Sequence, residues 1–350
     1  MMKKDLFDLN SLVRRNIASM KPYSSARDEF KGEAEVFLDA NENPYPSGFN
    51  RYPDPLQWKV KEKLAVLKGV TPEQIFLGNG SDEPIDLLIR AFCEPNRDAI
   101  MITTPTYGMY AVCADVNAVR IQQTNLTAEF DIDLYGILDA IDSTTRLIFL
   151  CSPNNPSAAL LERDKIISLV KSFNGIVVVD EAYIDFAQTK SFVEELNLYP
   201  NLVVLQTFSK AWGLAALRCG MAYASREIIQ ILNKIKYPYN INIQTQELVL
   251  KALQNVKQKN TWVEEILKER TALVNDLKTI AMVEKVFPSD ANFILVKIKQ
   301  AHTVYTYLMN NKIIVRDRSQ VKLCEDCLRI TVGTHSENKR LITSLQNYKA

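Results

Sequence analysis

The sequence predicts an α/β protein, with a mainly parallel β-sheet covered by helices on both faces and a smaller α+β unit beside it. Short apolar runs alternate with amphipathic segments from about residue 75 to 225, which is typical of strand–helix–strand units. The pattern then changes to a long helix followed by shorter apolar runs. A chain of 350 residues has room for one large or two medium domains.

Strands of the large sheet are expected at short apolar runs that can be buried on both faces. These runs are residues 75–77, 99–102, 118–121, 147–151, 176–179, 202–206 and 220–224. Helical patterns lie between several of them, for example at residues 83–92 and 162–172. Ligands of such sheets bind beyond the carboxyl ends of the strands, so the polar residues that follow these runs are the first candidates for a site.

The C-terminal part of the chain predicts a different unit. Apolar residues at helical spacing predict a long helix over residues 246–280. Further strands are expected at residues 292–296, 313–315 and 328–332. The first forty-odd residues are too few to fold alone, and we expect them to pack against this unit. The expected domains are therefore a large one, residues 46–270, and a small one, residues 1–45 together with 271–350.

Composition predicts a cytoplasmic protein that acts on small molecules. The formal net charge is +1, which gives no reason to expect nucleic acid or an anionic membrane as a partner. No apolar run reaches the roughly 20 residues of a membrane-spanning helix. The basic start, Met-Met-Lys-Lys-Asp, lacks the apolar core of a signal peptide.

The six cysteines do not predict a disulfide framework in a chain of this length. Cys324 and Cys327 form a lone C-x-x-C motif. A zinc site needs two further ligands, and only His302 and His335 are available outside the thiols. We expect no metal site and a reduced cysteine pair near a turn.

Two polar residues follow predicted strands of the large sheet. Asp180 comes directly after the run 176–179, and Lys210 lies in a turn after the run 202–206, upstream of Arg218. Taken separately, Asp180 could be a helix cap, Lys210 a solvated lysine and Arg218 an ion-paired arginine. An acid and a lysine at the ends of two strands can also hold one aromatic cofactor from opposite edges, as pyridoxal phosphate requires. Their order and spacing favour that cofactor.

Three further segments follow strand ends. The segment 78–83 (Gly-Asn-Gly-Ser-Asp-Glu) leads into a helix, where glycines and the helix N-terminus suit an anion, although a capped turn would also explain it. Tyr107 follows the strand at 99–102 and could stack on a pyridine ring or cap a turn. In the segment 152–156 (Ser-Pro-Asn-Asn-Pro), prolines fix a loop that could direct the Asn155 amide at the cofactor.

Together these segments resemble the fold-type-I pyridoxal-phosphate-dependent aminotransferases, and within them the histidinol-phosphate aminotransferase family. The resemblance covers nearly the whole chain. It begins in the segments 38–45 (Leu-Asp-Ala-Asn-Glu-Asn-Pro-Tyr) and 51–55 (Arg-Tyr-Pro-Asp-Pro) and continues to 328–333 (Leu-Arg-Ile-Thr-Val-Gly). The cofactor motifs are specific to the superfamily, and the substrate motifs discriminate less well among its members.

The resemblance implies a role for each cofactor residue. Lys210 is the Schiff-base lysine and moves the substrate proton, and Asp180 pairs with the pyridine nitrogen. Asn155 and Tyr183 bind the phenolic oxygen, and Tyr107 stacks on the ring. The implied phosphate ligands are the backbone at Gly80, Ser81 and Asp82, the hydroxyls of Thr207 and Ser209, and the guanidinium of Arg218. Tyr52 is implied to reach the phosphate of the neighbouring subunit's cofactor, which makes the active unit a homodimer.

The resemblance also implies the reaction, amino transfer between histidinol phosphate and 2-oxoglutarate. The implied substrate contacts are Tyr23, Asn41, Arg316 and Arg329. Because a guanidinium can donate two hydrogen bonds to either a phosphate or a carboxylate, Arg329 could serve histidinol phosphate and glutamate in turn. The alternatives are an aromatic-amino-acid aminotransferase, a threonine-phosphate decarboxylase of the same subgroup, or a cofactor-binding regulatory protein without turnover.

Two positions depart from the family pattern. The loop after Pro156 reads Ser157, Ala158, Ala159, where the family usually has a threonine and a glycine, and Ala216 replaces a common glycine. Both changes put the local loop geometry in doubt more than the chemistry.

Overall fold

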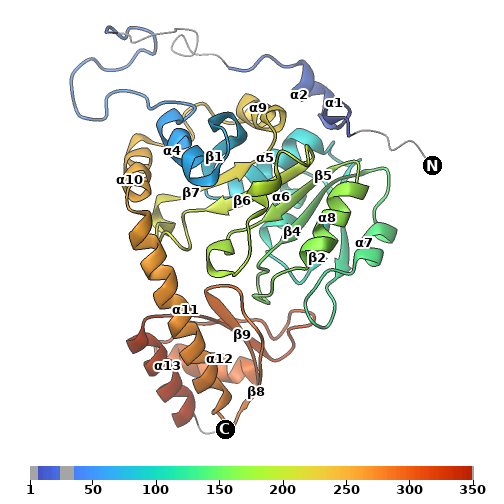
Figure 1. Ribbon diagram of the computed structural model, residues 1–350, viewed down its shortest axis with the longest axis vertical. Coiled ribbons are helices and arrows are strands. Elements are labelled where there is room, and N and C mark those ends of the chain that lie inside the picture. The colour runs from blue at the N-terminus through green and yellow to red at the C-terminus, as the bar shows by residue number, and fades with distance from the viewer. Residues whose placement is uncertain (1–6, 24–34, 349–350) are drawn as a thin grey trace.

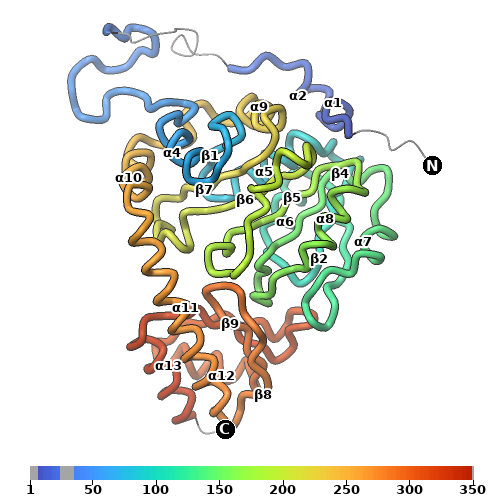
Figure 2. Tube along the Cα trace, in the orientation of Figure 1, coloured from blue at the N-terminus to red at the C-terminus, as the bar shows by residue number. Residues whose placement is uncertain are grey.

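The computed structural model describes residues 7–23 and 35–348. It consists of a large α/β unit and a smaller unit below it, with helix α11 running from one into the other (Figure 1). The C-terminus lies at the small unit, and the described N-terminal residues lie at the opposite end of the molecule. Figure 2 shows that the segment before α4 leaves the large unit as an extended loop.

The large sheet has seven strands in the order β1-β7-β6-β5-β4-β2-β3. Strands β2 to β6 pair in parallel, and β7 is antiparallel to both of its neighbours. The strands are β1 (Ile75–Asn79), β2 (Ala99–Thr104), β3 (Arg120–Asn125), β4 (Thr145–Cys151), β5 (Ile176–Asp180), β6 (Leu202–Thr207) and β7 (Cys219–Tyr223). The mainly parallel sheet expected from the sequence is confirmed.

Helices cover both faces of this sheet, as the alternation of strand side chains requires. Along β4, Ile148 and Leu150 pack into one apolar core, and Leu147 and Phe149 pack into the other. The first core includes residues of α4 (Trp58–Lys68), α7 (Leu134–Ala140), α8 (Arg163–Ser172) and α10 (Ile243–Leu253). The second includes residues of α5 (Asp82–Phe92), α6 (Met109–Val116) and α9 (Arg226–Ile235).

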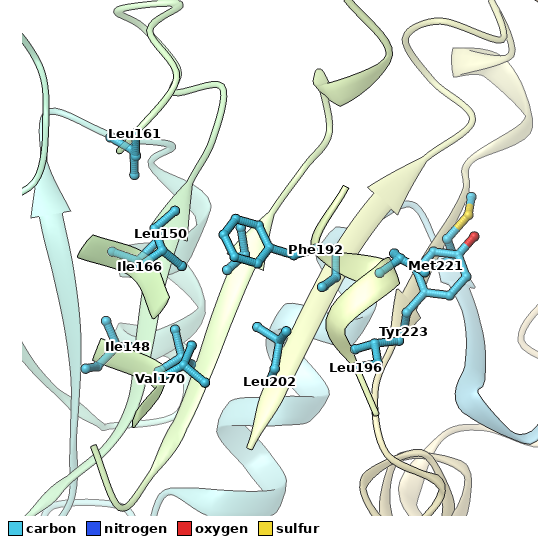
Figure 3. Close-up of a cluster of buried hydrophobic side chains, with 14 of the residues drawn as sticks. Ile148, Leu150, Leu161, Ile166, Val170, Phe192, Leu196, Leu202, Met221 and Tyr223 are labelled. Atoms are coloured by element: carbon cyan, nitrogen blue, oxygen red, sulfur yellow. The ribbon is translucent and has the colours of Figure 1, made fainter. Parts of the chain in front are cut away.

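Figure 3 shows part of the first core. Ile166 and Val170 of α8 lie against Ile148 and Leu150, and Leu202 lies between them and the side chains of Met221 and Tyr223. Both sides of the strands are buried, so the sheet is rigid where its carboxyl ends carry polar residues. Short 3₁₀ helices lie in the connections: η1 (Pro72–Gln74), η2 (Ile184–Phe186), η3 (Phe192–Glu195) and η4 (Ala215–Leu217).

The small unit contains an antiparallel sheet in the order β10-β11-β9-β8. Its strands are β8 (Val283–Val286), β9 (Phe293–Ile298), β10 (Arg316–Asp317) and β11 (Cys327–Thr331). Helices α11 (Val256–Lys278), α12 (Ala301–Asn310) and α13 (His335–Asn347) share an apolar core with one face of this sheet. The other face turns toward the large unit, and Leu295 belongs to a core there. None of the described helices has the length and apolar character needed to cross a membrane.

Three expected elements differ in the structure. The helix expected over residues 246–280 is broken between α10 and α11, because the Asn255 side chain accepts from the Gln258 N–H and starts a new helix. Strand β3 begins at Arg120 rather than at residue 118, because Ala118 has a φ of +53° at the end of a turn. Residues 313–315 are not a strand: the Ile313 N–H closes the end of α12 on Leu308.

Residues 7–23 contact the large unit, which differs from the expected packing against the C-terminal unit, and residues 1–6 and 24–34 of the same expectation lie outside the described residues. Helices α1 (Leu9–Leu12) and α2 (Arg15–Ser19) follow residues 7 and 8. The backbone N–H of Arg14 donates to Ala91 in α5 at 3.0 Å, and Lys234 in α9 donates to the carbonyl of Ala18 at 2.9 Å. Leu12 is buried in the core that contains α5. Phe7, Leu9 and Val13 pack against the same core, so apolar and polar contacts together join this segment to the large unit.

Candidate active site

A cavity of about 230 Å³ lies at the carboxyl ends of the parallel strands of the large sheet. It brings together all the cofactor-binding residues predicted from the sequence except Tyr52. These are Gly80, Ser81, Asp82, Tyr107, Asn155, Asp180, Tyr183, Thr207, Ser209, Lys210 and Arg218. Cys151, Ala182 and Ala215 also line it and were not predicted. The residues come from many separate loops, so it is the sheet that assembles the site.

Lys210 lies in the turn after β6, with its ammonium nitrogen 5.5 Å from the centre of the Tyr183 ring. Burial, followed by the positive charge of Arg329, lowers the pKa of Lys210. The negative charge of Asp180, the next largest contribution, raises the pKa of Lys210. The amine is therefore closer to its neutral, nucleophilic form than a solvated lysine is.

Asp180 ends β5 and is almost fully buried, with 2% of its surface exposed. One carboxylate oxygen accepts from the Tyr110 hydroxyl at 2.7 Å, and the other accepts from the Ala182 N–H at 3.0 Å. Burial raises the pKa of Asp180, whereas these two hydrogen bonds lower it. A buried carboxylate fixed in this way suits a protonated ring nitrogen as its partner.

Tyr110 is a residue of the site that sequence reasoning missed. Its side chain is fully buried, stacks on Phe149 at 5.0 Å, and meets the Tyr107 ring edge-on at 5.6 Å. Burial raises the pKa of Tyr110 well above its ordinary value, so the hydroxyl stays a donor. Tyr107 lies just before α6 and Tyr110 lies in the first turn of that helix, so the available signal was the close spacing of the two tyrosines in the sequence.

The turn between β1 and α5 forms the anion end of the cavity. Gly80 has a φ of +70°, and a Cβ there would come within 2.7 Å of an Arg218 guanidinium nitrogen. The Arg218 guanidinium lies 3.6 Å from Asp82, and the Tyr107 hydroxyl donates to Asp82 at 3.0 Å. The hydroxyls of Thr207 and Ser209 lie 3.0 Å apart beside them. A guanidinium, hydroxyls and a helix N-terminus are the donors that a phosphate requires, so these residues fit pyridoxal phosphate.

Asn155 and Arg329 connect the cavity to the small unit. A guanidinium nitrogen of Arg329 donates to the side-chain oxygen of Asn155. The Arg329 guanidinium lies 5.4 Å from the centre of the Phe293 ring, which packs edge-on against Tyr183 at 5.0 Å. Arg329 therefore lies beside the cavity without lining it.

The other predicted substrate residues are not brought to the cavity in this chain. Arg316 is exposed and stands opposite Arg329 in the small sheet. Tyr23 is 68% exposed. Asn41 and Tyr52 line a separate cavity of about 620 Å³, where Tyr52 stacks on Tyr239 with ring centres 4.4 Å apart.

The departures from the family pattern are accommodated locally. Ala158 is buried and has a φ of +65°, a conformation that favours glycine. Its N–H donates to Asn154, and the Asn154 side chain donates to the Ser157 hydroxyl at 2.9 Å. Ala216 lines a different cavity, beside Trp212. Cys324 and Cys327 are buried free thiols in the small unit.

Comparison with known proteins gives consistent matches. The family model for aminotransferase class I and II matches residues 31–345. Histidinol-phosphate aminotransferase of Cytophaga hutchinsonii is 57% identical over 98% of this chain and 99% of its own length. The protein of the same name from Parabacteroides distasonis is 55% identical over 98% of this chain and 99% of its own length.

The fold also matches solved structures. The histidinol-phosphate aminotransferase of Sinorhizobium meliloti, solved in complex with pyridoxal 5′-phosphate, superposes with a TM-score of 0.79 and 23% sequence identity. The match covers 88% of each chain. Family model, close relatives and fold agree, and the chain belongs to the class I and II aminotransferases, enzymes that depend on pyridoxal phosphate.

Proposed function

We propose that this enzyme transfers the amino group between L-histidinol phosphate and 2-oxoglutarate in histidine biosynthesis. The proposal rests on Arg329. Its guanidinium is half-buried beside the Lys210 cavity and forms no ion pair with any described carboxylate. A substrate anion can take that place. Similarity to histidinol-phosphate aminotransferases over nearly the full length of both chains supports this choice of substrate.

Bound pyridoxal phosphate supplies an electron sink for the electron pair left when the substrate α-proton is removed. Lys210 would hold the cofactor and then carry that proton, for which its lowered pKa is suited. Asp180 would keep the ring nitrogen protonated, and Tyr107 would stack on the ring. Asn155 and Tyr183 would bind its phenolic oxygen.

The proposed phosphate ligands share the turn before α5 and the turn after β6. They are the backbone at Gly80, Ser81 and Asp82, the hydroxyls of Thr207 and Ser209, and the guanidinium of Arg218. Because Arg218 lies near Asp82, a phosphate would compete with this carboxylate for the guanidinium. The Asp82 carboxylate would therefore keep the Arg218 guanidinium oriented until the phosphate is bound.

Arg329 would bind the phosphate of histidinol phosphate in one half-reaction and the glutamate α-carboxylate in the other. Arg316, opposite Arg329 across the strand pair, would add charge for the phosphate. Tyr23 and Asn41 are proposed as further substrate contacts.

The proposed active unit is a cytoplasmic homodimer with shared sites. Tyr52 is 50% exposed and lies in the extended segment before α4, where it is available to reach a second subunit's cofactor. Oligomers with such exchanged contacts are usually symmetric pairs. We also propose a domain boundary near residue 270, within α11, with the small domain from residue 271 onward.

Rapid mixing of the cofactor-loaded enzyme with single amines tests the substrate assignment. Histidinol phosphate should convert the cofactor spectrum to its aminated form faster than phenylalanine does. Threonine phosphate should release no carbon dioxide. Faster conversion by phenylalanine would favour an aromatic aminotransferase, carbon dioxide release would favour a decarboxylase, and no conversion by any amine would favour a regulatory protein.

A further inference from the structure

Three arginines lie together on the small antiparallel sheet. Arg316 in β10 stands directly opposite Arg329 in β11, and directly opposed residues of an antiparallel pair share a face. The Arg318 N–H donates to the Cys327 carbonyl at 2.9 Å, which extends the same ladder by one step. Because side chains alternate along a strand, Arg318 lies on the same face as Arg316.

The neighbouring residues show that this face turns toward the large unit, which contains the active-site cavity. Leu295, the β9 partner of Arg329, packs into a core of the large unit. Ile294 and Val296, which flank it, pack into the core of the small unit. Burial raises the pKa of the Tyr183 hydroxyl, while the charges of Arg329 and Arg318 oppose that rise. Both arginines are therefore within electrostatic reach of a residue that lines the cavity.

No carboxylate of the described residues forms an ion pair with Arg316, Arg318 or Arg329, although the charge of Asp317 raises the pKa of Arg318. The Nε atom of Arg318 is buried and has no hydrogen-bond partner there. Asp317 is the nearest acid in sequence, but His302 and Ser319 already bind its carboxylate, at 2.8 and 2.6 Å. Burial, followed by the charges of Arg329 and Arg316, lowers the pKa of Arg318. A half-buried guanidinium without a partner, beside two like charges, is unfavourable unless an anion joins them.

We infer that Arg318 is a third anion-binding residue of the active site and joins Arg316 in holding the second negative charge of a phosphate-monoester substrate. The inference rests on the proposed function and deepens it. A carboxylate carries one charge, which Arg329 alone can balance, whereas a phosphate dianion has three acceptor oxygens and a second charge. Arg318 thereby separates the two substrates that share the Arg329 position.

Kinetics with matched substrates test the assignment. The holoenzyme and its Arg318→Gln variant are compared on L-histidinol phosphate and on L-histidinol, which lacks only the phosphate. We expect kcat/KM for the phosphate ester to fall about 10-fold or more, with a change of less than about 2-fold for L-histidinol. Arg318→Lys, which keeps the charge but loses the planar fork, should lie between. Equal losses on both substrates would overturn the inference.

Arg340→Gln is the control, because Arg340 lies in the same unit and donates only to the Asn311 carbonyl at 3.2 Å. It should leave both rates unchanged. Without phosphate, Arg318→Gln should melt no lower than the wild type, since the substitution removes an unpaired charge. A much lower melting temperature together with equal kinetic losses would identify Arg318 as a structural residue.

A second measurement decides the inference even if histidinol phosphate is not a substrate, a result that would overturn the proposed function alone. Inorganic phosphate is titrated into both holoenzymes while their melting temperatures are recorded. Wild type should gain stability, and Arg318→Gln should need about 10-fold more phosphate for the same gain. Equal responses, or no response in the wild type, would overturn the inference.

Discussion

Asp180 is held by two hydrogen bonds that come from different parts of the fold. The Tyr110 hydroxyl reaches it from α6, and the Ala182 N–H reaches it from the loop after β5. Since the carboxylate is buried, its orientation and its ionisation both depend on these donors. Tyr110 does not line the cavity, so its expected role is to position Asp180.

Tyr110→Phe should leave the fold intact and slow amino transfer by about 10-fold. A hydrogen bond to a charged group is worth about 1.5–3 kcal/mol, and the Ala182 N–H retains part of the support. Losing a donor to the carboxylate raises the pKa of Asp180, so the acid limb of the kcat profile should move to higher pH. Tyr307→Phe is the matched control, because that hydroxyl donates to the Ser344 carbonyl in the small unit. An unshifted acid limb would show that Tyr110 only fills space.

The sequence could identify those site residues that directly follow a predicted strand. Lys210 and Asp180 follow apolar runs that had to be strands, and parallel strands end at one edge of a sheet. Tyr110 and Arg318 could not be found in this way. The significance of Tyr110 depends on its hydrogen bond to Asp180, which lies far away in sequence, and that of Arg318 depends on the charge of Arg329 in the neighbouring strand.

Gly80 shows how a single element shapes the site. The turn between β1 and α5 needs a residue with a φ of +70° and no side chain, because the Arg218 guanidinium occupies that space. Gly69 ends α4 with nearly the same φ, +69°, but a Cβ there would meet nothing within 4 Å. Substituting each glycine in turn therefore distinguishes the effect of backbone strain, which both positions share, from the displacement of Arg218, which only Gly80 would cause.

Gly80→Ala should weaken cofactor binding, and Gly69→Ala should not. Both variants adopt the same left-handed conformation, with a cost of about 1 kcal/mol each. Only the first displaces Arg218 from the proposed phosphate ligands, so its cofactor dissociation constant should rise about 10-fold. Equilibrium dialysis of the two variants measures this. Similar dissociation constants would mean that Arg218 does not contribute to phosphate binding.

Elements with strong periodicity were predictable, and those decided by tertiary contacts were not. The buried strands of the large sheet lie close to their expected places because each apolar run has only one way to be covered on both faces. Strand β8 has only two apolar residues, Val283 and Val286, and its pairing with β9 defines it. The break at Asn255 depends on a capping hydrogen bond that helical periodicity does not reveal.

For the whole molecule, the large unit supplies the cavity and the small unit supplies the arginines. Arg329 spans the two by its contact with Asn155. The edge-on contact between the rings of Phe293 and Tyr183 also joins the two units. Tyr52 and Tyr23 remain exposed on the same molecule, which fits a site completed by a second subunit.

Mixed dimers test whether Tyr52 serves the neighbouring site. Lys210→Ala and Tyr52→Ala should each have little activity alone. A dimer of one with the other retains one site with both residues intact. Random exchange should therefore restore about a quarter of the wild-type activity, because half of the dimers are mixed and each has one intact site. No recovery, when mass spectrometry shows mixed dimers, would place Tyr52 in its own subunit's site or outside any site.

Lys210 is the residue proposed to hold the cofactor, and the chemistry of the site depends on it. Lys61 is a useful rival, since it is also buried and burial lowers its pKa to about 8, but it lies against Trp58, outside the residues that line the cavity. Borohydride reduction of the holoenzyme fixes the cofactor to the amine that holds it, and peptide mapping by mass spectrometry then identifies the labelled lysine. A pyridoxyl group is expected on Lys210 and on no other lysine. A label on Lys61 or any other lysine, or no label at all, would contradict this assignment.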